Sequence, residues 1–241
     1  MINGVTEINY NFPSLHKFQQ NTDKMIKIAI LDFDGTLGDT TDVIVRTTQA
    51  TIKEMGLPER SDEQCAAMIG LRLVEIPPVL FPECEVDCDL YAVTYRRLFH
   101  EFNTEGAVQL YPNVMDTLME LKRRGIILTI ASSRSNASLT EYINNLGLAS
   151  TITCILGAND VKKGKPDPEA VNKTLERFDI NADEAIVVGD TIFDIEMGRN
   201  AGTRTCGVSY GNGSRESLSK ADWIIDDFGE LLKLISWPNL S

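Results

Sequence analysis

Short apolar runs alternate with amphipathic stretches along most of the chain. The runs are mostly continuous rather than alternating in polarity, as in strands that are covered on both faces of a sheet. Between them, apolar residues recur every three or four positions and stop at a glycine, which predicts helices over 113–125 and 136–147. The predicted strands are 26–31, 126–131, 152–156, 185–189, 205–208 and 223–225. This alternation predicts an α/β fold with a Rossmann-like, doubly wound parallel sheet.

One segment interrupts the alternation, because its patterns are helical throughout. Residues 39–108 follow the first predicted strand and contain amphipathic patterns over 41–56 and 87–103. Open α/β sheets bind ligands at the carboxyl ends of their strands, and the chain leaves the sheet at such an end. We therefore predict an all-α cap domain over 39–108, inserted into a catalytic core formed by 25–38 and 109–241.

Residues 1–24 are polar and precede the first convincing strand. Because of this polar composition we expect a poorly ordered N-terminal extension, and without basic and apolar regions it does not resemble a secretory signal. No stretch approaches the roughly 18 consecutive apolar residues that indicate a membrane span. The five cysteines are odd in number and scattered, and two histidines are too few to complete a zinc site with them. Reduced thiols and a cytoplasmic location are expected.

The formal net charge of the 241 residues is -12. An acidic chain without a run of lysine or arginine is a poor candidate for binding nucleic acid or a membrane surface. An anionic substrate would therefore need positive charge concentrated at its site. The oligomeric state stays open between a monomer and a homodimer.

Polar side chains follow directly after several predicted strands. Because the carboxyl ends of parallel strands lie along one edge of the sheet, we expect these side chains to converge there. They are Asp32 and Asp34 after the first strand, Ser132 and Ser133 after the second, Lys165 in the loop after the third, and Asp190 and Asp194 after the fourth.

Each residue type at this edge suits one part of phosphoryl transfer. Asp32 and Asp190, with a backbone carbonyl, offer the hard oxygen ligands that Mg²⁺ prefers, and the cation would offset the repulsion between carboxylates. One carboxylate can attack phosphorus, while a second one two residues further protonates the leaving oxygen. Lys165 is a compact cation for phosphate, Gly35 lets the backbone turn toward it, and Ser132 can bind its oxygens.

Four motifs resemble those of the haloacid dehalogenase superfamily of phosphohydrolases, in the family's order. They are DFDGTL at 32–37, Ser132 after LTIA, Lys165 within GKPDP, and GDTIFD at 189–194. The resemblance covers residues 25 to about 230, and its carboxyl-terminal part looks like that of the phosphoglycolate phosphatase group. It implies a Mg²⁺-dependent phosphatase acting on a small phosphorylated metabolite, such as phosphoglycolate or a sugar phosphate, through an aspartyl-phosphate.

The resemblance also implies a role for each matching residue. Asp32 is the nucleophile, and Asp34 is the general acid/base, whose backbone carbonyl binds the metal. The family's dehalogenases lack this second aspartate, so its presence favours phosphate transfer. The remaining roles are phosphate binding by Ser132 and the Ser133 amide, orientation of phosphate by Lys165, metal binding by Asp32, Asp190 and Asp194, and substrate binding near Gly35, Thr36 and Arg72.

Three alternatives stay open from the sequence. A sugar phosphomutase would share the nucleophile, metal and lysine and differ in the contacts of the cap. A signalling receiver domain also combines aspartates, a hydroxyl, a lysine and Mg²⁺, but it is about half as long and its phosphorylated aspartate follows a central strand. A capped fold kept for binding alone is the third. Arg134 is expected to reach either the substrate or the surface, and His100 to pack against its neighbours.

Overall fold

The core of the molecule is a six-stranded parallel sheet. The computed structural model describes residues 25–104 and 106–235, so the predicted extension at 1–24 lies outside the described residues. The strand order is β5-β4-β1-β6-β7-β8, and every neighbouring pair is parallel. The strands are β1 (Ile28–Leu31), β4 (Ile127–Ala131), β5 (Cys154–Leu156), β6 (Ala185–Gly189), β7 (Arg204–Val208) and β8 (Trp223–Ile225). All six were predicted, and the doubly wound α/β class is confirmed.

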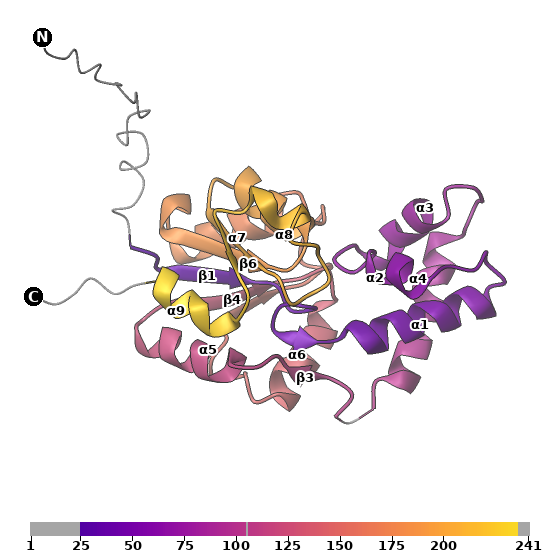
Figure 1. Cartoon of the computed structure of the whole chain (residues 1–241), viewed down its shortest axis with the longest axis horizontal. Coiled ribbons are helices and arrows are strands. Elements are labelled where there is room, and N and C mark those ends of the chain that lie inside the picture. Colours follow the sequence, from indigo (N-terminus) through magenta and orange to yellow (C-terminus); the bar gives the residue numbers. More distant parts are fainter. Residues whose placement is uncertain (1–24, 105, 236–241) are drawn as a thin grey trace, which may run out of the picture.

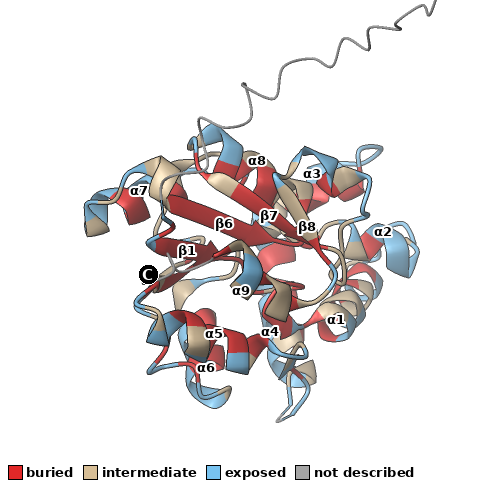
Figure 2. Ribbon diagram, turned by 60° about the vertical axis from the view of Figure 1, so that its left-hand side comes forward, coloured by how far each residue is buried: buried red, intermediate tan, exposed pale blue. Residues whose placement is uncertain are grey.

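Helices cover both faces of this sheet, because its strand residues are apolar on both sides (Figures 1 and 2). Ala29 and Leu31 belong to one apolar cluster, with α5 (Val114–Arg123), α6 (Asn136–Asn145) and α9 (Leu231–Leu234). Ile28 and Ile30 point the other way and belong to a second cluster, with α7 (Glu169–Phe178) and α8 (Ile192–Asn200). The two-residue period of a strand thus explains why the run at 28–31 is continuously apolar.

The segment between β2 and β3 is helical and stands at the carboxyl ends of the strands (Figure 1). It contains α1 (Thr41–Glu54), α2 (Asp62–Ala66), α3 (Ile76–Leu80) and α4 (Cys88–Phe102). These helices enclose an apolar cluster of their own, formed by Ile52, Cys65, Ile76, Leu80, Phe81 and Tyr91. Within the described ranges, no helix is both long and apolar enough to cross a membrane.

Two short strands join the helical segment to the sheet. β2 (Gly38–Asp39) and β3 (Gln109–Leu110) pair antiparallel, with Gly38 opposite Leu110. The sequence did not predict them, because two residues are too few to show a periodicity. The outgoing and returning chains therefore lie side by side where they leave the core.

The sheet reverses its winding direction at β1, which lies between β4 and β6. In doubly wound sheets, such a reversal opens a crevice outside the carboxyl ends of the strands. Asp32 directly follows β1, so the fold places the first aspartate of the DFDGTL motif at this crevice.

Candidate active site

The chain turns sharply after β1 because of Gly35. Its φ is +79°, a conformation that residues with a side chain rarely adopt. A Cβ there would lie 2.2 Å from Oδ2 of Asp190 and 2.3 Å from Nδ2 of Asn212. The glycine therefore provides both the turn and the close approach of this loop to Asp190.

Three carboxylates meet where β1 and β6 end. Asp32, Asp190 and Asp194 are buried and each offers a carboxylate oxygen, with these oxygens within 4.8 Å of one another. Lys165 is buried among them, and its Nζ lies 2.5 Å from Oδ1 of Asp32 and 2.5 Å from Oδ1 of Asp194. The structure thus brings together four residues that the sequence placed at this edge.

The charges in this cluster do not balance, since one ammonium faces three carboxylates. Burial raises the pKa of Asp32 well above its ordinary value, and the attraction of Lys165 only partly opposes this. Burial and the neighbouring Asp194 raise the pKa of Asp190 to about 7. Burial alone would lower the pKa of Lys165, but Asp194 and Asp32 outweigh it and raise this pKa.

A divalent cation fits this cluster for two reasons. Carboxylate oxygens are the ligands that Mg²⁺ prefers, and the positive charge of the ion would compensate the excess of carboxylates. The carboxyl of Asp34 is not part of this cluster.

A loop after β7 holds Asp190, which the sequence did not reveal. Asn212 donates to Oδ2 of Asp190 from its backbone N at 2.7 Å and from its Nδ2 at 2.9 Å. The hydroxyl of Thr36 lies 3.3 Å from Oδ1 of the same carboxylate, and substrate binding by Thr36 stays a prediction. The only signal in the sequence was an asparagine between two glycines, 211–213, after a predicted strand.

The carboxylate of Asp34 lies outside the cluster and binds Arg134. The guanidinium contacts both carboxylate oxygens, with Nη2 2.6 Å from Oδ1 and Nε 3.1 Å from Oδ2. It also lies 4.8 Å from the ring centre of Phe99 in α4 and 4.9 Å from that of Tyr142 in α6. Arg134 therefore lines the cavity and links Asp34 to rings of the core and of the helical segment. Contact of Arg134 with the substrate stays a prediction.

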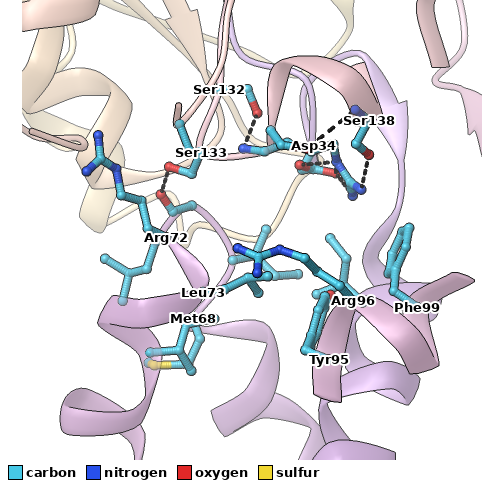
Figure 3. A pocket seen from close by; sticks show the side chains of 18 of the residues that line it. Asp34, Met68, Arg72, Leu73, Tyr95, Arg96, Phe99, Ser132, Ser133 and Ser138 are labelled. Atoms are coloured by element: carbon cyan, nitrogen blue, oxygen red, sulfur yellow. Dashed lines mark hydrogen bonds and ion pairs between the residues drawn. The ribbon is translucent and has the colours of Figure 1, made fainter. Parts of the chain in front are cut away.

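The two serines after β4 make different contacts (Figure 3). Oγ of Ser132 accepts a hydrogen bond from the backbone N of Arg134 at 3.2 Å, at a buried position. Oγ of Ser133 donates to the carbonyl of Gly70 at 2.5 Å, which connects the core to the helical segment.

Arg72 supports the same junction from the helical side. It donates to the carbonyls of Val161 and Lys162, at 3.0 Å each, in the loop that carries Lys165. Gly164 makes this approach possible, because a Cβ there would lie 2.8 Å from Nε of Arg72. Substrate binding by Arg72 stays a prediction.

Known proteins resemble this chain over most of its length. The model of the haloacid dehalogenase-like hydrolases matches residues 29–208. The chain belongs to this family. Over 229 residues it is 31% identical to a phosphoglycolate phosphatase of Vibrio cholerae, covering 88% of this chain and 98% of the relative.

Two further proteins match a similar share of this chain. A pyrophosphatase PpaX of Bacillus velezensis is 32% identical over 215 residues, covering 88% of this chain and 98% of the relative. A crystal structure from Haemophilus somnus, described as a predicted phosphoglycolate phosphatase, has a TM-score of 0.77 at 25% identity and covers 88% of this chain and 98% of its own. The expectation of a phosphatase of this family is confirmed.

A cavity of about 560 Å³ lies between the core and the helical segment of this hydrolase (Figure 3). Asp32, Asp34, Ser132 and Ser133 line it from the core. The helical segment adds mostly apolar side chains, among them Met68, Leu73, Ile76, Tyr95 and Phe99. His100 also lines it and is exposed, so the expectation that His100 packs against neighbours is wrong: it lies on the face of α4 that meets the cavity.

Proposed function

We propose that this hydrolase is a Mg²⁺-dependent phosphatase of a small phosphorylated metabolite, either a phosphoglycolate-like acid or a sugar phosphate. The observation that carries the proposal is the position of Asp32. Its carboxylate is buried at the carboxyl end of β1, is held by Lys165 and lines the cavity. A fixed carboxylate at the floor of a cavity suits in-line attack on phosphorus.

Each residue of the site takes one part of the reaction. An oxygen of Asp32 attacks phosphorus and carries the phosphoryl group as an aspartyl-phosphate. Lys165 holds this carboxylate and counters the charge of the phosphate. Ser132 and the backbone amide of Ser133 bind phosphate oxygens at the start of the loop before α6. Asp34 protonates the leaving oxygen and then takes a proton from water.

The metal would be held by Asp32, Asp190 and the backbone carbonyl of Asp34, with Asp194 at or just behind it. When bound, Mg²⁺ supplies the positive charge that stabilises the charge spread over the phosphoryl oxygens. Asn212 and Thr36 fix the direction of the Asp190 carboxylate through their hydrogen bonds.

We also propose that residues 39–108 act as a cap that excludes water from the site. Three observations support this role: the apolar cluster within the segment, the β2–β3 pair at its base, and the cavity between it and the core. A closed site strengthens the electrostatic contacts on which phosphoryl transfer depends. Residues 25–38 and 109–241 would form the catalytic core.

The same proposal includes a cytoplasmic location and a small-molecule partner. The five cysteines are free, as expected in a reducing compartment. The net charge of -12 disfavours nucleic acid as a partner.

The proposal is tested by phosphate release from a panel of phosphorylated metabolites, with Mg²⁺ or with EDTA. We expect Mg²⁺-dependent release, and Asp32→Asn should lower it by on the order of 10⁴-fold or more, because the nucleophile is lost. Retention of full Mg²⁺-dependent activity by Asp32→Asn would refute the assignment. Isomerised sugar phosphate without net phosphate release would instead identify a phosphomutase.

A further inference from the structure

Four side chains that can carry positive charge line the cavity, and two of them are already engaged. Arg134 is bound to Asp34, and Arg72 donates to two backbone carbonyls. Arg96 differs: among the described residues, no hydrogen bond, ion pair or ring contact involves its guanidinium. Figure 3 shows Arg96 extending from α4 into the cavity. The fourth, His100, lies one turn further along the same helix.

The neighbouring arginine on α4, Arg97, faces away from the cavity and has acidic partners. Arg97 does not line the cavity, and it forms ion pairs with Glu54 and with Glu101, the latter at 2.9 Å. Successive residues of a helix are about 100° apart, so the two guanidiniums lie on different faces. The helix therefore directs one of two adjacent cations toward the site, where no other residue within 25–104 and 106–235 pairs with it.

The surroundings of Arg96 favour binding of an anion. Met68, Leu73, Tyr95 and Phe99 also line the cavity, and apart from the Tyr95 hydroxyl their side chains bring no group that would form strong hydrogen bonds with a ligand (Figure 3). An ion pair gains strength when water is displaced from around it, and a guanidinium can bind a carboxylate or phosphate through two parallel hydrogen bonds.

We propose that Arg96 binds a second anionic group of the substrate, a carboxylate or a phosphate, while the scissile phosphate lies at Asp32. The side chain thereby selects esters and anhydrides with two anionic groups over esters with a neutral organic part. This inference rests on the proposed phosphatase function and names the substrate class that the site accepts.

The experiment compares three substrates that differ at the second group. Phosphoglycolate carries a carboxylate, pyrophosphate carries a phosphate, and ethyl phosphate has a neutral group of similar size to the glycolate part. For Arg96→Gln we expect kcat/KM to fall by about 10- to 100-fold for the anionic substrates that the wild type accepts, mainly through KM. Ethyl phosphate should change by less than about twofold, because it makes no ion pair with Arg96.

Arg97→Gln is the matched control, since it removes the same charge from the next residue of the helix. It should leave all three kcat/KM values within about twofold. Glu141→Gln tests whether the overall charge of the cavity matters, because Glu141 also lines the cavity and is exposed. A gain for Glu141→Gln as large as the loss for Arg96→Gln would show that overall charge rather than contact decides, and would overturn the proposal.

Each remaining outcome either identifies the anion that Arg96 binds or refutes the proposal. A loss confined to phosphoglycolate assigns a carboxylate to Arg96, and a loss confined to pyrophosphate assigns a phosphate. Equal losses for ethyl phosphate and for the anionic substrates would refute selection by Arg96, as would wild-type kcat/KM values that do not favour a second anion. In both cases the phosphatase function would stand. Absence of any Asp32-dependent hydrolysis by the wild type would refute the proposed function itself.

Discussion

The floor of the cavity, formed by the buried carboxylates at the ends of β1 and β6, differs in construction from its wall, formed by the helical segment. On the floor, Asp32, Asp190 and Asp194 are buried, and hydrogen bonds or ion pairs hold each carboxylate. On the wall, α4 presents apolar side chains and Arg96, which is exposed and has no partner within the described part of the chain. On the floor, protein contacts fix the direction of each carboxylate although negative charge stays in excess, whereas on the wall the Arg96 guanidinium is held by no contact among the described residues.

Removal of the Lys165 side chain should have the largest effect on the floor. At pH 8, Lys165→Met should destabilise the metal-free protein by about 3–5 kcal/mol, because it leaves buried carboxylates without their cation. Activity should fall by on the order of 10³-fold or more, since the nucleophile loses the group that holds it. Urea unfolding and phosphate release measure the two effects.

Lys163→Met is the control for this change. The side chain of Lys163 is 75% exposed and forms an ion pair of 3.3 Å with Asp167, so its loss should cost at most about 1 kcal/mol and leave activity unchanged. If the two variants were equally stable, the ion pairs of Lys165 would not be what holds the carboxylates of the floor in place.

A substitution of Asp34 tests whether its carboxylate belongs to the metal-binding cluster of the floor. Asp34→Asn should lower kcat by about 10²- to 10⁴-fold, because an amide cannot exchange the proton of the leaving oxygen. Mg²⁺ affinity, measured by calorimetry, should stay within about threefold, since the backbone carbonyl is unchanged. Asp39→Asn, at an exposed position that accepts from the Tyr111 hydroxyl, should behave as the wild type. Loss of Mg²⁺ binding in Asp34→Asn would show that its carboxylate is a ligand.

The floor was readable from the sequence because the topology of a parallel sheet fixes it. Asp32 and Asp190 follow apolar runs directly, so identifying the strands was enough to bring these residues together. The six strands were visible for the same reason, since each is an apolar run covered on both faces. Lys165 was found through its place in GKPDP rather than through geometry.

The wall was not readable, because its geometry depends on how helices pack. The amphipathic pattern predicted α4, but Arg96 and Arg97 look alike in the sequence and only their rotation about the helix axis separates them. The sequence did not show what Arg134 contacts, because its partner, Asp34, is 100 residues away. Asn212 was missed because it lies in an irregular loop whose contact with Asp190 has no periodic signature.

The pH dependence of stability tests whether the floor is short of positive charge. The pKa of Asp190 is raised from 3.8 to about 7, so the folded protein keeps a proton that the unfolded chain has lost between these values. The metal-free protein should therefore lose stability as the pH rises from about 4 to 7, since the unfolded state binds fewer protons there. Asp32, whose pKa is also raised, acts in the same direction.

Thermal unfolding in EDTA and in Mg²⁺ measures this effect. Mg²⁺ should raise the midpoint more at pH 7.5 than at pH 5, because it binds the ionised carboxylates. In Asp190→Asn the decline in EDTA should be shallower. If the midpoint in EDTA rose steadily from pH 5 to 7, the carboxylates of the floor would be balanced without a metal.

The smallest expected effect concerns the contact between the two regions. Ser133→Ala removes the hydrogen bond from Oγ of Ser133 to the carbonyl of Gly70, which joins the loop after β4 to the helical segment. It should lower stability by about 1 kcal/mol and speed hydrogen exchange around 68–73, with the exposed Ser150→Ala as control. Unchanged exchange in Ser133→Ala would mean that other contacts, such as those of Arg72, anchor the wall. The wall would then hold its position independently of the loop after β4.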